Sequence, residues 1–235
     1  MPKNAIVEGV DIGGRFSISN TSEDLAKRLA SAKQILSPVT LIAAHPDDET
    51  LFAGLFMQKC LQLSLVIVFD DPVPKKAKCR REELEAALHA LNIKPKSIKY
   101  LNIPEGEYEK IRELGSDISS SIVPKSPILI SHTIQGGHPD HDQTAIFARS
   151  VVKRNAPQRL LEFHCYCDRN NPVSTVGFCT KSESSTRVEY TRQSLDRKVK
   201  ALQCFESQRE IIKNFHPALE WIRSAPTICH DSVIG

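Results

Sequence analysis

Residues 39–49 read Val-Thr-Leu-Ile-Ala-Ala-His-Pro-Asp-Asp-Glu, an apolar run that ends in a histidine, a proline and three acidic residues. The apolar part, residues 39–44, has the length and composition of a short buried strand. Pro46 sets a rigid turn and fits the first turn of a helix, where the helix dipole also favours acidic side chains. The stretch therefore predicts a strand that passes through one tight turn into a helix.

The same order of apolar run and amphipathic stretch repeats along the chain. We expect strands over residues 39–44, 63–69, 97–101 and 127–131, and helices over residues 49–61, 76–91, 107–122 and 139–153. Alternating strands and helices favour an α/β fold. The predicted architecture is a Rossmann-like, doubly wound, mostly parallel sheet with helices on both faces.

A second polar motif follows another expected strand: Ser131 leads into Gly136-Gly137-His138-Pro139-Asp140-His141-Asp142. Ligands of open α/β sheets bind at the carboxyl ends of the strands, so we expect the two motifs to meet. His45 and Asp48 can bend toward one point, and His141 can supply a third ligand. Two histidines and one carboxylate leave a position for water, as in catalytic zinc sites.

Several polar residues stand beside these three. Asp47 and His138 are placed to handle protons, while Asp140 and Asp142 fit helix entry or the orientation of a ligand histidine. The acidic residues 47–49 also fit a plain helix cap, but the histidines of both motifs favour the metal site. Gly136-Gly137 fits either a plain loop turn or a close approach of backbone to substrate. We interpret His132 as a loop histidine in preference to a partner of the site.

The segments that flank the alternation are less regular. We expect a helix over residues 23–36, a strand over 161–167 that residues 173–180 can join, and a helix over 194–214. We predict a single domain over residues 1–235. Its parts are a lead-in with an N-terminal helix, a core sheet with the metal site, and a C-terminal appendage, over residues 1–37, 38–153 and 154–235.

The composition is that of a soluble globular protein. Of the 235 residues, 40% are hydrophobic and 25% charged, and the net charge of +3 is too small to indicate nucleic-acid binding. We expect no membrane partner and a cytoplasmic location, because the sequence has no signal peptide and no long apolar stretch. The seven cysteines include no C-x-x-C pair, which favours reduced thiols. The sequence is compatible with a homo-oligomer as well as with a monomer.

The two motifs, Ala44-His45-Pro46-Asp47-Asp48-Glu49 and His138-Pro139-Asp140-His141, resemble the PIG-L/LmbE family of zinc-dependent N-acetylglucosaminyl deacetylases. Two weaker stretches agree. Residues 80–92 resemble the family's Arg/Glu helix, with Asn92 where a glycine is usual. Residues 198–208 resemble its late motif, with Phe205 where the family has a histidine.

The resemblance implies roles for the matching residues. His45, Asp48 and His141 would bind one Zn²⁺, Asp47 would be the general base, and His138 would be the electrophilic or acid partner. Arg80 and Arg81, on the Arg/Glu helix, would lie near the site or the substrate. Other divalent metals also fit this mixed ligand set.

The predicted function is removal of an acetyl group from a small N-acetylated sugar or glycoside by metal-activated water. An amidase for another N-acyl amine, such as a thiol conjugate or a secondary-metabolite intermediate, fits the same residues. A non-catalytic nucleotide-binding module fits less well, because the turn Ala43-Ala44-His45-Pro46 lacks the pattern G-x-G-x-x-G.

Overall fold

The computed structural model describes residues 9–10, 22–117, 123–154, 159–166 and 185–225. Its strands are β1 (Gly9–Val10), β2 (Gln34–Ile35), β3 (Val39–Ala43), β4 (Leu63–Asp70), β5 (Ser97–Pro104), β6 (Ile128–His132), β7 (Arg159–Phe163), β8 (Thr186–Arg187) and β9 (Trp221–Ser224). Its helices are α1 (Ser22–Ser31), α2 (Asp48–Met57), α3 (Pro74–Ala90), α4 (Tyr108–Asp117), α5 (Pro139–Arg154), α7 (Arg192–Leu202), the 3-10 helix η1 (Glu206–Gln208) and α8 (Arg209–Ile212). Within these described segments, no helix has the length and apolar character needed to cross a membrane.

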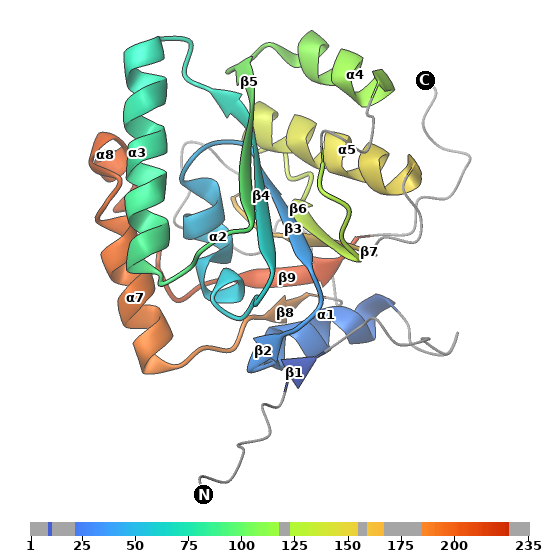
Figure 1. The fold of residues 1–235 in the computed structure, drawn as a ribbon, viewed down its shortest axis with the longest axis vertical. Helices are drawn as coiled ribbons and strands as arrows, with labels where there is room; N and C mark the ends of the chain where they lie inside the picture. Colours follow the sequence, from blue (N-terminus) through green and yellow to red (C-terminus); the bar gives the residue numbers. More distant parts are fainter. Residues whose placement is uncertain (1–8, 11–21, 118–122, 155–158, 167–184, 226–235) are drawn as a thin grey trace, which may run out of the picture.

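The main sheet has the strand order β5-β4-β3-β6-β7-β9-β8 (Figure 1). The five strands from β5 to β7 are parallel, and β9 runs antiparallel to both of its neighbours. Strands β1 and β2 form a separate parallel pair. The arrangement confirms the predicted α/β fold with a Rossmann-like, mostly parallel sheet.

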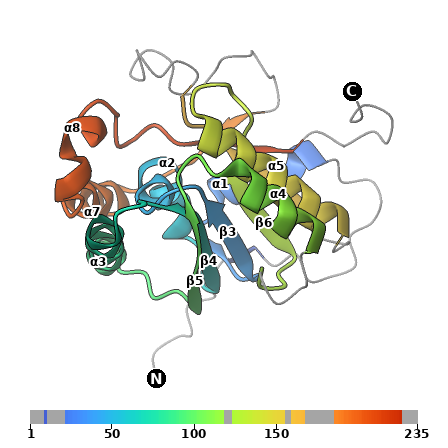
Figure 2. The same ribbon diagram turned by 90° about the horizontal axis from the view of Figure 1, so that it is seen from above.

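Helices cover both faces of the sheet (Figure 2). Leu41 and Leu65 point into a core shared with α1, α2, α3 and α7, whereas Ile42 and Val66 point into a second core with α4 and α5. Alternate residues of β3 and β4 thus meet apolar neighbours on both sides. This explains why these strands are continuous apolar runs in the sequence.

The strand order places a topological switch point between β3 and β6. From β3 the chain winds outward through β4 to β5, and from β6 it winds the other way to β7. The register pairs Ile42 with Ser131, whose hydroxyl donates to the Ile42 carbonyl oxygen at 2.9 Å. The two polar motifs follow these neighbouring strand ends, in the crevice where doubly wound proteins bind ligands.

Several predicted boundaries were wrong. The helix expected over residues 23–36 ends at Ser31, because residues 34–35 pair with β1 as a strand. The helix expected over residues 194–214 breaks after Leu202, where Phe205 turns its side chain into the core. Strand β9 lies in the tail to which we assigned no element, and residues 118–122 and 173–180 lie outside the described residues.

The end of α3 explains the asparagine found in place of the family's glycine. Asn92 has φ 59°, a left-handed conformation that closes many helices and that Asn tolerates better than most residues. Its N–H donates to the His89 carbonyl at 3.0 Å, and Ile93 N–H donates to the Leu88 carbonyl at 2.9 Å. Asn92 therefore closes α3 in a conformation that glycine also adopts readily.

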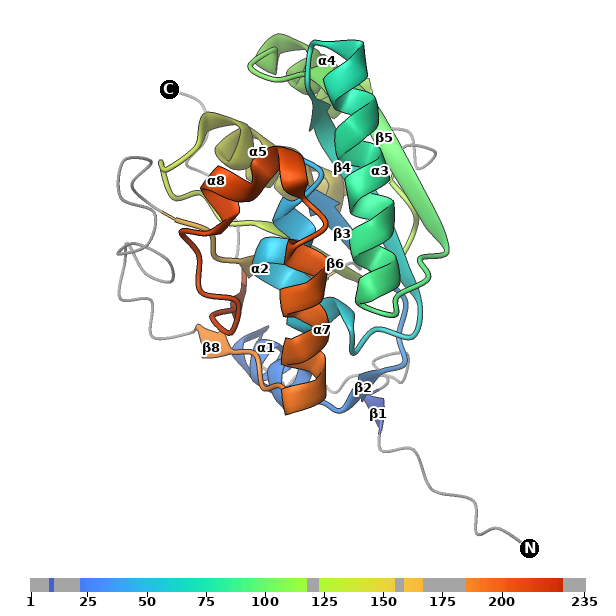
Figure 3. The same cartoon turned by 90° about the vertical axis from the view of Figure 1, so that its left-hand side faces the viewer.

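A buried ion pair ties α2 to the C-terminal part of the chain, where α7 lies against α2 and α3 (Figure 3). Lys198 Nζ donates to Glu220 Oε1 at 2.5 Å and to the Leu51 carbonyl at 2.7 Å. The Glu220 carboxylate accepts from the N–H groups of Leu55 and Phe56 at 2.7 and 3.1 Å. Both charged side chains are fully buried, so each depends on the other for its stability in the core.

We predict that Lys198→Met lowers the free energy of unfolding by about 3–5 kcal/mol, because it leaves the Glu220 charge buried without its partner. Urea denaturation measures the change. The matched control is Lys213→Met, which removes the lysine of an exposed pair with Glu210 and should leave the midpoint almost unchanged. Equal midpoints for the two variants would contradict the assigned role of the buried pair.

Candidate active site

The turn between β3 and α2 carries the first motif. Asp47 has φ 157° and ψ −33°, a conformation that side-chain-bearing residues rarely adopt. Its N–H donates to the His45 carbonyl at 3.0 Å and to Glu49 Oε2 at 3.1 Å. Glu49 is fully buried, and burial raises its pKa to about 8. Glu49 therefore faces the turn and stabilises its shape, in which Asp47 and Asp48 are both presented beside His45.

His45, Asp48 and His141 meet at the crevice between β3 and β6. His45 Nδ1 lies 3.2 Å from Asp48 Oδ2, and His141 Nε2 lies 3.2 Å from Asp48 Oδ1. All three side chains are buried, and one donor atom of each lies within 4.8 Å of the others. The residues that the sequence singled out as metal ligands are thus brought together, with a spacing that a single cation can span.

Two other groups of donor atoms lie within the same distance: His45, His138 and Asp140, and His132, His141 and Cys165. His132 Nε2 accepts from the Ala44 N–H at 2.9 Å, and its Nδ1 lies 3.1 Å from Cys165 Sγ. Both ring nitrogens of His132 are therefore engaged, and its ring stacks on His141 at 4.4 Å. His132 is a partner of the site that braces β3 and His141, not the plain loop histidine that we expected.

The charges around His45 favour a cation. Burial lowers the pKa of His45, but the hydrogen bonds to Asp140 and Asp48 together outweigh burial. The resulting pKa is about 10. Although burial opposes it, His141 and His45 hold the pKa of Asp48 well below its usual range. Buried carboxylates and imidazoles in this arrangement need a positive charge between them, which either a proton or a metal ion can supply.

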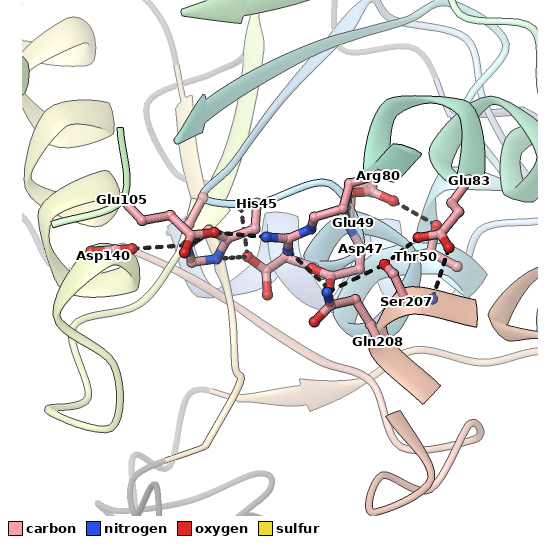
Figure 4. Close-up of polar contacts among 12 residues, drawn as sticks. His45, Asp47, Glu49, Thr50, Arg80, Glu83, Glu105, Asp140, Ser207 and Gln208 are labelled. Atoms are coloured by element: carbon pink, nitrogen blue, oxygen red, sulfur yellow. Dashed lines mark hydrogen bonds and ion pairs between the residues drawn. The ribbon is translucent and has the colours of Figure 1, made fainter. Parts of the chain in front are cut away.

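Asp47 points toward Arg80 and lines the same pocket as His45, Asp48 and His141 (Figure 4). Arg80 is buried; its Nη2 donates to Asp47 Oδ2 at 3.2 Å and its Nη1 to Glu105 Oε1 at 2.7 Å. Burial raises the pKa of Asp47 to about 6, and the Arg80 charge limits the rise. Asp47 is therefore mostly ionised at neutral pH but has a pKa closer to neutrality than an ordinary carboxyl, which suits a group that accepts a proton.

His138 lies over the same group of donors. Its ring stacks on His141 at 4.6 Å, and its Nδ1 accepts from the Asp140 N–H at 3.2 Å. Burial and the neighbouring histidines His141 and His45 lower the pKa of His138 to about 4. The imidazole is therefore neutral at pH 7 in this arrangement, and the proton-donor role expected of it requires negative charge to develop nearby.

The comparisons with known proteins agree with this geometry. Residues 40–152 match the sequence model of the PIG-L family, described as GlcNAc-PI de-N-acetylase. This stretch of the chain is similar to the PIG-L family. The matched residues hold both motifs and the strands that place them. No curated protein matches the chain in sequence.

Solved structures with this fold include two deacetylases and a hydratase. The N,N'-diacetylchitobiose deacetylase of Pyrococcus horikoshii is 18% identical, with a TM-score of 0.53 and 82% of each chain covered. A deacetylase of the teicoplanin biosynthetic pathway, studied as a triple mutant, is 15% identical, with a TM-score of 0.55 over 80% of this chain and 97% of that one. The 4-carboxy-2-hydroxymuconate hydratase GalB of Pseudomonas putida is 14% identical, with a TM-score of 0.55 over 83% and 99%. The shared fold therefore supports more than one reaction.

Of the other residues predicted from the sequence, some approach the ligand group and some do not. Asp140 Oδ2 lies 2.8 Å from His45 Nε2, as expected of a carboxylate that orients a ligand. Asp142 instead accepts from the backbone N–H groups of residues 135 and 136 and holds the loop before α5. Arg81 bonds to Asp70 and Asn102 and packs on the Tyr100 ring, so it stabilises the β4–β5 edge and does not line the pocket.

The glycines of the second motif have separate structural reasons. Gly136 has φ 77°, which favours glycine. A Cβ on Gly137 would come within 2.0 Å of the Tyr166 carbonyl oxygen. The loop therefore needs both glycines for its own conformation and packing, in agreement with the plain-turn interpretation.

The site opens into a pocket of about 180 Å³. Its lining includes the predicted residues His45, Asp47, Asp48, Arg80, His138 and His141. It also includes residues that we did not predict, namely Leu51, Phe52, Glu105, Tyr166, Gln208, Ile211, Ile212 and Phe215. Gln208 lies in the late stretch that resembles the family motif, and that resemblance was the only available signal; the apolar residues carry no recognisable pattern.

We predict that His45 is an imidazolium at pH 7.5 in metal-free protein, because its raised folded-state pKa keeps the proton bound until the pH nears 10. NMR of the ring nitrogens after chelation measures its protonation. Asp140→Asn should lower this pKa by removing a charged hydrogen-bond partner. A His45 ring that titrates near pH 6.5 in the unsubstituted protein would contradict the assigned electrostatics.

Proposed function

We propose that this protein is a zinc-dependent hydrolase that removes the acetyl group from an N-acetylated amino sugar of the N-acetylglucosamine type. The observation that carries the proposal is the meeting of His45, Asp48 and His141 in one pocket with Asp47, a buried carboxylate left outside that group. A nearby carboxylate that is not itself a ligand is what hydrolysis by an activated water requires.

The residues present fit a divalent metal. The donor set is mixed nitrogen and oxygen, and His141 Nδ1 is buried without a hydrogen-bond partner among the described residues. His45, Asp48 and His141 would hold the ion, and Asp140 would orient His45 through Nε2. Zinc in such a site supplies a water of lowered pKa and polarises the substrate carbonyl.

The remaining chemistry belongs to the side chains around the pocket. Asp47 accepts the proton of the attacking water, and Arg80 holds its carboxylate in place at 3.2 Å. His138 faces the same space from the second motif and stabilises the negative charge that develops on the carbonyl oxygen, or returns a proton to the leaving amine. Acetate and a free amine are the products.

An amidase for another N-acyl amine is the alternative. The same residues would attack any amide carbonyl that reached Asp47, and pocket shape alone would select the acyl group. The sugar is favoured by the family match and by the small pocket, which has polar side chains such as Arg80 and Glu105 on one side.

The direct test is acetate release by zinc-loaded protein from a panel of N-acetyl sugars, sugar nucleotides and N-acetylglucosaminyl glycosides. N-acyl amino acids and N-acyl thiol conjugates form the comparison panel. Release from at least one glycoside, and little from the comparison panel, supports the proposal. Turnover of the comparison panel alone would replace the proposal with the amidase.

We predict that the protein binds one zinc ion and that Asp48→Ala abolishes this binding, because Asp48 is the link between the two histidines. Metal analysis after dialysis measures the content. Glu82→Ala, at an exposed position on α3, is the control and should keep the full complement. Full zinc content in Asp48→Ala would remove Asp48 from the ligand set.

We predict that Asp47→Asn keeps the zinc and lowers kcat by roughly 10²–10⁴-fold, because it removes the group that accepts the proton of water. The amide keeps the size of the side chain and can still face Arg80. Steady-state kinetics and metal analysis on the same preparation separate the two effects. A near-normal kcat would leave Asp47 as part of the turn alone.

We predict that kcat/KM falls as the pH drops below the pKa of Asp47, because the protonated carboxyl cannot act as a base. The Arg80 charge lowers this pKa, so Arg80→Met should move the acid limb to higher pH. The pH–rate profiles of the two proteins measure the shift. If the acid limb of kcat/KM in Arg80→Met stays in place or moves to lower pH, a group other than Asp47 controls that limb.

A further inference from the structure

The pocket has two chemically different sides. Asp47, Arg80 and Glu105 form a charged side beside the ligand group. A second group of lining residues is apolar or aromatic, with Phe52 and Tyr166 beside His141. Its members come from α2, from the segment after β7, and from α8 and the residues that follow it: Leu51, Phe52, Tyr166, Ile211, Ile212 and Phe215. The C-terminal members lie outside residues 40–152, which the family model matches.

The apolar wall is well supported. The rings of Phe52, Tyr166 and Phe215 pack against one another with centroids 5.4–6.2 Å apart. The 3-10 helix η1, directly before α8, is held by Ser207, whose N–H and Oγ donate to the Glu83 carboxylate of α3 at 2.8 and 2.6 Å (Figure 4). The wall is therefore held by contacts within the protein.

The exposure of these residues shows the depth of the wall. Leu51 and Phe52 are buried beside Asp48 at the base of the pocket, whereas Ile211 is 54% exposed at its rim. A pocket of about 180 Å³ is smaller than the usual range for whole ligands, about 300–1,000 Å³. The short acetyl group fits the base, so the larger amine-side part of the substrate must extend over the rim.

The late stretch contributes one polar residue, Gln208, to the pocket lining. The late motif of the family has a histidine at the position of Phe205, and Phe205 is buried in the main core. The rim instead presents Ile211, with Ile212 and Phe215 below it. These side chains offer no hydrogen bond to sugar hydroxyls, and they gain free energy only by covering apolar surface.

We propose, resting on the proposed function, that Ile211, Ile212 and Phe215 form a subsite for an apolar group on the amine side of the substrate. The substrate class is an N-acetylated amino sugar that carries an alkyl or aryl aglycone. The charged side of the pocket then holds the sugar ring, and the wall covers the aglycone.

The test compares acetate release from the methyl, hexyl and phenyl glycosides of N-acetylglucosamine. We expect kcat/KM for the hexyl and phenyl glycosides to exceed that for the methyl glycoside by about 10-fold or more, as for other apolar contacts in a binding pocket. Ile211→Ser should reduce the preference in kcat/KM for the hexyl and phenyl glycosides over the methyl glycoside several-fold. Calorimetry should show that the same variant also binds the amine product, the phenyl glycoside of glucosamine, several-fold more weakly.

The matched control is Ile146→Ser, because Ile146 is a 47% exposed isoleucine on α5 that does not line the pocket. In this variant, kcat/KM for the hexyl and phenyl glycosides relative to the methyl glycoside should equal that of the unsubstituted protein. Equal rates for the three glycosides, or an unchanged ratio in Ile211→Ser, would overturn the subsite while the deacetylase stands. Absence of acetate release from every glycoside, with release from another N-acyl amine, would overturn the proposed function and the subsite together.

Discussion

The carboxylate of Asp48 joins the two halves of the site, with one oxygen 3.2 Å from His45 and the other 3.2 Å from His141. These histidines come from motifs almost a hundred residues apart, and they meet only because β3 and β6 are neighbours in the sheet. The parallel register that pairs Ile42 with Ser131 places the carboxyl ends of β3 and β6 side by side. The switch in winding direction at this point leaves the crevice open for a ligand.

The charged side chains that surround Asp48 form ion pairs, which stabilise their burial in the protein. Arg80 from α3 compensates Asp47, and Glu105 at the end of β5 compensates Arg80. On the far side of α2, Lys198 and Glu220 bind its backbone within the core. Each of these ion pairs joins residues from different parts of the chain, so the helix that begins at Asp48 is held in place by tertiary contacts as well as by local propensity.

The local parts of this arrangement could be predicted from the sequence, and the long-range parts could not. The run at residues 39–49 is short and strongly patterned, so its strand, turn and helix, and the choice of His45 and Asp48 as donor residues, could be predicted from the pattern. The turn of Phe205 into the core and the pairing of residues 34–35 depend on partners distant in sequence. Arg80 and Arg81 are adjacent on α3 but point to different partners, and only the helix packing distinguishes the pocket residue from the edge residue.

The most direct test of the account is anomalous diffraction at the zinc edge from crystals of the zinc-loaded protein. The account predicts one strong peak within bonding distance of His45, Asp48 and His141, with Asp47 outside the coordination sphere. A peak held by His132, His141 and Cys165, a peak held by His45, His138 and Asp140, or no peak in this pocket would contradict it.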